Sequence, residues 1–181
     1  MNKDFRVYLC VSNGADPTNS GKGIISLDEP IHTDLEPRLE SDGYVWKYLY
    51  TIKPSDIVRF DSADFIPLPS DWSTNTDVAD VRNNAVDGKI ETVVIEDVSN
   101  ASYQFTGTKN AVPILGDGSG ALASVTFIDG KPSSVQVTNG GSGYSFATLD
   151  LDSVVTGVGA SFTVIIPPPG GHGSDIYREL G

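Results

Sequence analysis

The chain is poor in cysteine and in positive charge. Its single cysteine, Cys10, excludes an intramolecular disulfide, and its place in a predicted strand makes it an expected buried, unreactive thiol. Twelve lysines and arginines stand against 24 acidic residues, which gives a net charge of −12. Because nucleic acids and anionic membranes attract clustered basic residues, we expect neither as a partner.

Long apolar runs are missing as well. No stretch approaches the roughly 20 apolar residues of a membrane helix, and the N-terminus lacks the apolar core of a signal peptide. A cytoplasmic origin is therefore expected. The 19 glycines and 11 prolines predict many turns, and the length allows one domain or two small ones.

One aromatic stretch, Asp42–Ile52 (DGYVWKYLYTI), is expected to organise the N-terminal part. It begins with a turn pair, and its aromatic residues then recur at every second position. Period two with aromatic and β-branched residues predicts a strand, and large aromatic side chains anchor cores. An exposed aromatic platform for a sugar or a partner is the alternative. The predicted fold-defining residues are Asp42, Gly43, Tyr44, Trp46, Tyr48 and Tyr50.

The segment Asp42–Pro54 (DGYVWKYLYTIKP) resembles a motif in the baseplate wedge subunit that gene eight encodes in T-even-type contractile-tailed phages. As in that family, a strand over Arg6–Val11 and a turn-rich stretch precede the motif, so the resemblance covers roughly residues 1–70. It implies a virion structural protein of the tail baseplate, assembled in the host cytoplasm, with no catalysis, cofactor or metal. Its implied partners are other baseplate or tail proteins, and a homodimer is allowed because family members dimerise. Since those members are longer, we expect an inner portion of such a protein or a trimmed relative.

The remaining chain shows an internal repeat. Asp87-Gly88-Lys89 recurs as Asp129-Gly130-Lys131, and Gly118–Ala121 has a counterpart in Gly157–Ala160. Each copy reads as strands separated by glycine-rich turns, so two copies could pack as a pseudo-symmetric sandwich. We therefore predict a mainly β, β-sandwich-like fold with a duplicated Gly-rich β unit and one short helix.

Four regions follow from these patterns. The aromatic-strand β region spans 1–75, a short helix and connector 76–86, the duplicated β region 87–167 (copies 87–128 and 129–167), and a linker-like tail 168–181. Within the first region, 12–43 is a long irregular connection in which Ile24–Leu27 could add a short strand. A helical turn can start at Pro54, and Thr76 or Asp77 can cap the helix that follows.

Motifs that suggest chemistry fail on spacing or context. Gly14–Gly23 has the wrong spacing for a phosphate-binding loop, and Gly118–Ala123 leads into a strand where a dinucleotide site needs a helix. Asn139–Ser145 resembles a calcium-binding β-roll, but Ser145 stands where that motif has aspartate. His32 and His172 lack partners at metal-ligand spacing.

Acidic pairs give no coherent catalytic site either. Asp61 with Asp64, and Glu96 with Asp97, could be imagined as a glycosidase couple, yet 24 acidic residues make chance pairs inevitable. We expect no enzyme, and the functional surfaces are the connection 12–43, the proline-rich segment 65–72 and exposed strand edges. The alternative function is a carbohydrate-binding or adhesin-type β module on a tail or cell surface.

Overall fold

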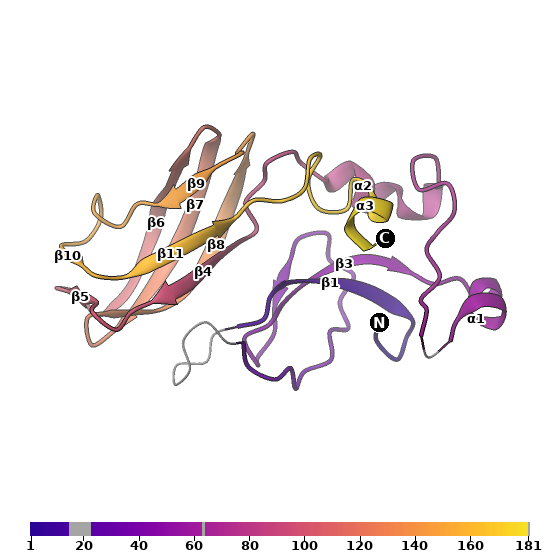
Figure 1. Ribbon diagram of the computed structural model, residues 1–181, viewed down its shortest axis with the longest axis horizontal. Helices are drawn as coiled ribbons and strands as arrows, with labels where there is room; N and C mark the ends of the chain where they lie inside the picture. Colours follow the sequence, from indigo (N-terminus) through magenta and orange to yellow (C-terminus); the bar gives the residue numbers. More distant parts are fainter. Residues whose placement is uncertain (15–22, 63, 181) are drawn as a thin grey trace.

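The computed structural model describes residues 1–14, 23–62 and 64–180, and it is mainly β, as predicted (Figure 1). Within this part of the chain, no helix has both the length and the apolar character needed to cross a membrane. The elements in chain order are β1 (Arg6–Ser12), β2 (Arg38–Leu39), β3 (Val45–Thr51), α1 (Pro54–Phe60), a 3-10 turn (Thr76–Val78), α2 (Ala79–Asn84), β4 (Thr92–Asp97), β5 (Ser102–Tyr103), β6 (Gly107–Gly116), β7 (Ser119–Ile128), β8 (Lys131–Ser142), β9 (Ala147–Leu149), β10 (Gly157–Val158), β11 (Ser161–Ile165) and α3 (Ile176–Leu180).

The N-terminal sheet is antiparallel with β3 at its centre, in the order β1-β3-β2. Its register shifts between Val7 and Tyr8, which pair with Tyr50 and Tyr48 and leave Leu49 as an extra residue on β3. Leu49 and Tyr50 are consequently both buried, at 0% and 1% exposure, although they are neighbours. The strict alternation expected along this strand is thus broken by a β-bulge.

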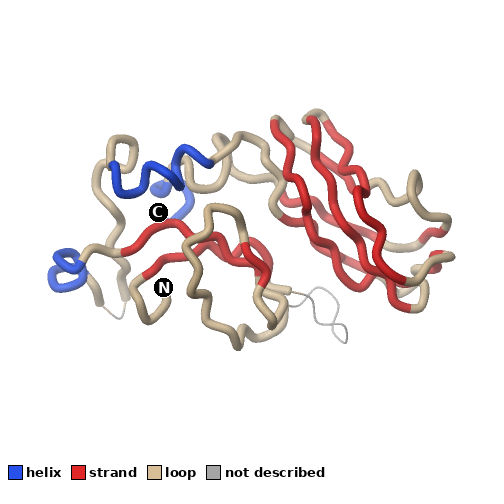
Figure 2. Tube along the Cα trace, turned by 180° about the vertical axis from the view of Figure 1, so that it is seen from behind, coloured by secondary structure: helices blue, strands red, loops and turns tan. Residues whose placement is uncertain are grey.

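The C-terminal strands curl around one core, which Figures 1 and 2 show from opposite sides. A four-stranded sheet has the order β8-β7-β6-β9, and β4 pairs with β11. Fully buried residues such as Val112, Val125 and Phe127 fill the space between them. Burying the apolar faces of both sheets in one core is what a sandwich-like fold requires.

Residues related by the sequence repeat make reciprocal contacts across this core. Tyr144 N donates to Gly88 O (3.3 Å), and Tyr103 N donates to Gly130 O (2.9 Å). Both glycines have positive φ, +62° and +74°, which glycine adopts without strain. The first strand of each copy pairs with the last strand of the other, since β4 pairs with β11 and β8 with β7. Each copy therefore completes the other.

The rings of Tyr144 and Tyr103 make the same kind of reciprocal contact between the two copies. A Cβ atom at Gly118 would lie 2.5 Å from the ring of Tyr144, and one at Gly157 would lie 2.5 Å from the ring of Tyr103. Tyr144 also accepts a hydrogen bond from Ala121 N and donates one to Ile114 O, both at 3.1 Å. Glycine is needed at these turns because a facing aromatic ring occupies the space of a side chain.

The tail 168–181, predicted to be a linker, instead packs on the N-terminal core. Its α3 buries Ile176 completely, and Trp72 Nε1 donates to Gly173 O and Ser174 O at 3.2 and 3.1 Å. Figure 1 shows this yellow segment returning to lie beside α2. The linker interpretation is wrong because the anchoring contacts are made with residues about 100 positions away.

Other local expectations also change. Cys10 is exposed rather than buried, because it lies where the β1–β3 register shifts again, and partial desolvation raises its pKa. Residues 24–27 form no strand. The turn before α2 is capped by Asn75, whose side chain accepts from Asp77 N, rather than by Thr76 or Asp77. Residues 15–22 of the connection 12–43, and with them most of Gly14–Gly23, lie outside the described residues.

Candidate functional site

The acidic residue that opens the aromatic motif fastens the preceding connection. Asp42 Oδ2 accepts hydrogen bonds from Leu27 N (2.7 Å) and Asp28 N (3.0 Å), and its Oδ1 accepts from Tyr44 N (3.1 Å). The bond from Asp28 N contributes most to lowering the pKa of Asp42 to about 2. Gly43 follows with φ +89°. These two residues therefore set the geometry of the turn, as a fold-defining role requires.

The aromatic side chains of the motif split between two environments. Tyr44 and Trp46 stack with ring centroids 5.5 Å apart, and Tyr48 meets Tyr8 edge to face at 5.9 Å. Tyr50 instead enters the core, where its hydroxyl donates to Pro67 O at 3.1 Å and burial raises its pKa to about 12. The structure thus brings Tyr44 and Trp46 together, but sets Tyr48 against Tyr8 and Tyr50 against Trp72, so the predicted residues do not form one continuous aromatic face.

A hollow of about 390 Å³ adjoins the half-buried members of this group. Trp46 and Tyr8 form part of its wall, and the acidic residues Asp28 and Glu29 also line it. The indole Nε1 of Trp46 is buried, and residues 1–14, 23–62 and 64–180 offer it no hydrogen-bond partner. An aromatic wall beside carboxylates offers both an apolar contact and hydrogen-bond acceptors to a ligand.

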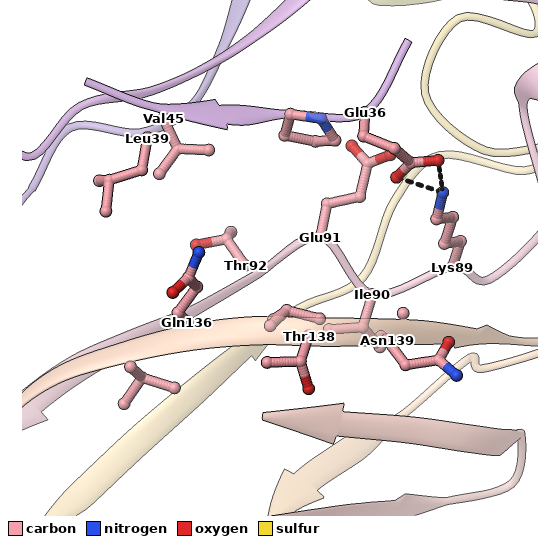
Figure 3. Close-up of a pocket in the computed structure, with 14 residues that line it drawn as sticks. Glu36, Leu39, Val45, Lys89, Ile90, Glu91, Thr92, Gln136, Thr138 and Asn139 are labelled. Carbon is pink, nitrogen blue, oxygen red and sulfur yellow. Dashed lines mark hydrogen bonds and ion pairs between the residues drawn. The ribbon is translucent and has the colours of Figure 1, made fainter. Parts of the chain in front are cut away.

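A larger cleft of about 400 Å³ lies between the N-terminal sheet and the C-terminal strands (Figure 3). One wall comes from the connection 36–39 and from Val45, and the other from residues 89–92 and 135–140. Half-buried Val135 and Val137 alternate along β8 with exposed Gln136 and Thr138. The cleft therefore offers apolar and polar side chains on a strand.

Two ion pairs join the halves at one end of this cleft. Lys89 Nζ lies 2.7 Å from both carboxylate oxygens of Glu36, and Lys47 Nζ lies 2.6 Å from Glu91 Oε1. The second pair is deeply buried, with side-chain exposures of 2% and 4%, and Glu91 Oε2 has no hydrogen-bond partner in the part of the chain that the structure describes. Burial raises the pKa of Glu36, but hydrogen bonds from Lys89 and Asn84 outweigh it, so that pKa lies below its usual value.

The residues considered for catalysis or metal binding are buried or take part in contacts that hold the fold. His32 is 7% exposed, neither ring nitrogen has a hydrogen-bond partner among the described residues, and burial lowers its pKa. His172 pairs with Glu179 at 2.5 Å in the packed tail. Ser145, in the calcium-like stretch, donates through N and Oγ to Asp117 at 2.9 and 2.5 Å.

The acidic pairs considered as a glycosidase couple also lie in ordinary structural settings. Asp97 accepts from Ser99 N and Oγ, which lowers its pKa and closes a turn after β4. Asp61 is half-buried, and the nearby Asp64 is exposed. Across residues 1–14, 23–62 and 64–180, no group of three or more His, Cys, Asp and Glu side chains is arranged to hold a metal ion.

The cleft itself could not be found from the sequence. Its walls come from separate segments whose polar residues each look like ordinary solvated positions. One signal existed: Lys47 is a charged residue within an otherwise apolar, aromatic strand, and a charge in such a place needs a partner.

Comparison of the chain with protein-family models, curated proteins and solved structures finds no match.

Proposed function

We propose that the chain is a structural component of a contractile phage tail baseplate, most specifically of its wedge, and acts in the virion through protein–protein contacts. The observation that carries the proposal is the resemblance of DGYVWKYLYTIKP at Asp42–Pro54. The motif resides in the central strand of the N-terminal sheet and in the turn that fastens its longest connection. This position supports the interpretation of the motif as fold-defining sequence.

Exposed apolar side chains at one end support a role in assembly. In and after α1, Val58 is 87% exposed, Phe60 61% and Phe65 73%. Large apolar side chains that gather on a surface mark sites of protein contact. Asp56, Asp61 and Asp64 occur in the same stretch of sequence, consistent with the acidic chain meeting basic neighbours.

The test is co-expression with each protein encoded beside this chain, followed by affinity capture of a tag on this chain and light scattering after size exclusion. A stoichiometric complex with a tail protein is the expected result, and scattering also reads out a homodimer. The variant Phe65→Ser should weaken the complex. The control Phe146→Ser should not, because it changes the same kind of side chain, 64% exposed, in the C-terminal β region. A monomer that captures none of these proteins contradicts the proposal.

A second candidate function, carbohydrate binding, rests on the hollow beside Trp46. Sugars stack on aromatic rings and accept or donate hydrogen bonds at their hydroxyls, and Asp28 and Glu29 face the same space. A glycan array is the direct assay. Hits that Trp46→Ala removes would favour this function, whereas an array without signal above background would contradict it.

A further inference from the structure

One segment of the N-terminal region lies on the sheet without pairing to it. Residues 29–34, which we call the flap, belong to the connection 12–43 and form no strand or helix. In the part of the chain that the structure describes, no backbone-to-backbone hydrogen bond involves any of them. Segments with few such bonds open locally at a lower free-energy cost than paired strands do. The flap can therefore open while the sheet beside it stays folded.

Side chains near the N-terminus hold the flap through its main-chain carbonyl groups. Hydrogen bonds join Asn2 Nδ2 to Pro30 O (2.8 Å), Arg6 Nη1 to Ile31 O, and Tyr8 OH to His32 O (2.7 Å). Because the acceptors are carbonyl oxygens, these bonds do not depend on which side chains the flap itself has. What distinguishes the flap from an ordinary surface loop is the one side chain that it buries.

That side chain is His32, the only buried residue within 23–40. Its ring meets the ring of Tyr8 edge to face, with centroids 5.4 Å apart. Neither ring nitrogen makes a hydrogen bond of normal geometry within the described chain, although the main chain of Trp46 lies near the ring. A buried polar group without a partner costs free energy, and a charged group in the same place costs much more. The site therefore accepts a neutral imidazole far better than an imidazolium ion.

Charged groups of both signs lie around this ring. Burial is the largest influence and lowers the pKa of His32, while Asp34 and Glu40 act to raise it and Arg38 acts to lower it. The two carboxylates do not offset burial, so the pKa of His32 lies below its ordinary value of 6.5. From β1 the facing group is Tyr8, and burial raises the pKa of its hydroxyl, which therefore stays neutral wherever histidine titrates. The group that changes charge in mild acid is the imidazole.

Contacts that keep their charge in mild acid bound the flap on both sides. Before it, Asp42 accepts hydrogen bonds from Leu27 N and Asp28 N, and its pKa of about 2 keeps this carboxylate ionised. After it, the pKa of the ion-paired Glu36 also lies below its usual value. Protonation of His32 would thus act on the short segment between these two fixed points.

We propose that residues 29–34 form an acid-sensitive flap, which stays closed on Tyr8 while His32 is neutral and opens when its ring takes up a proton. Opening lets water solvate the imidazolium ion, which the closed site does not. It also uncovers Tyr8 and removes one wall of the hollow beside Trp46, since Pro30 lines that hollow. The inference goes beyond the proposed function, because it requires neither a partner protein nor a ligand.

The test follows the intact protein by NMR between pH 7 and pH 5. The ring protons of His32 report its protonation, and relaxation dispersion of the backbone amides at 31–34 reports the population of an open state. The closed flap keeps its stability above about pH 6.5 and loses it as the pH falls, because the open form binds the proton more readily. The open population should therefore rise by up to about 25-fold over this range. The amides of Leu27 and Asp28, which Asp42 holds, should show no such rise.

Two substitutions separate His32 from other groups that titrate. His32→Phe retains an aromatic ring that takes up no proton, so the flap should stay closed at pH 5. His172→Gln changes the only other histidine of the chain and should leave the response to acid unchanged. A rise of less than about threefold in the wild type would overturn the proposal. So would protonation of His32 without any change at residues 31–34, or an equal rise in His32→Phe.

Discussion

Replacing Lys47 with methionine should strongly destabilise the protein, because this lysine is one half of a buried ion pair between the two parts of the fold. Lys47 lies on β3 and Glu91 immediately before β4, with 2.6 Å between Nζ and Oε1. Their side chains are 2% and 4% exposed. No described residue donates a hydrogen bond to Glu91 Oε2, so removal of Lys47 leaves the carboxylate without compensation.

The magnitude follows from two opposing terms. Opposite unit charges at this separation attract by about 6 kcal/mol at an effective dielectric constant near 20. Desolvation of the two ions costs several kcal/mol each, so the intact pair contributes little net stability. Loss of one partner leaves the desolvation of the other, and Lys47→Met should lower the free energy of unfolding by about 3–5 kcal/mol. The double variant Lys47→Met with Glu91→Leu should recover to within about 1 kcal/mol of the wild type.

Urea titration followed by circular dichroism provides the free energies for the double-mutant cycle. The exposed pair Lys53–Asp77 (2.8 Å) is the control, and Lys53→Met should leave the unfolding midpoint nearly unchanged because both side chains are more than half exposed. A cost below about 1 kcal/mol for Lys47→Met would refute the reasoning. So would a double variant whose cost equals the sum of the two single costs.

Three further perturbations test other parts of the fold. Burial lowers the pKa of His32, so the unfolded chain binds a proton at this residue more readily than the folded chain does. The free energy of unfolding should therefore fall by up to about 1.4 kcal/mol per pH unit as the pH drops below about 6.5. If the urea midpoint changes with pH in the same way for the wild type and for His32→Phe, this reasoning is contradicted. Ile176→Ala should cost about 2–5 kcal/mol in the same titration, and a cost near zero would mean that the tail does not pack. Gly88→Ala should lower the melting temperature more than Gly143→Ala, because both have positive φ but only at Gly88 would a Cβ lie 2.2 Å from a facing backbone nitrogen; equal losses would exclude the steric term.

The strand around the aromatic motif was predictable because its pattern is local. Alternating aromatic residues after an Asp-Gly turn are sufficient to predict β3, and the side chain of Asp42 acts at short range as expected. The bulge at Leu49 was not predictable, because it depends on how β3 pairs with β1 about 40 positions earlier. A sequence pattern with period two contains no information on where the partner strand shifts register.

The tail and the cleft escaped prediction for a related reason. A helix as short as α3 has too few residues to show a period, and its buried residue is recognised only through the distant Trp72. The cleft brings Glu36, Lys89 and Gln136 together from three segments. Each residue alone is typical of a solvated surface, so only the tertiary arrangement reveals that they share a site.

The repeat explains how the strands around β4 and β8 are arranged. Exchange of strands between the copies satisfies β4 through β11 and β8 through β7, and these two joints are equivalent. The joint between β4 and β8 is different, because it brings together the first strands of both copies and no third pair remains to close it. The N-terminal region covers one end of this seam with Lys47 and Glu36, each paired to a residue just before β4. Ile90 N donates to Gly140 O (2.9 Å) at the same end, so the segment that precedes β4 and the N-terminal region close this end of the seam together.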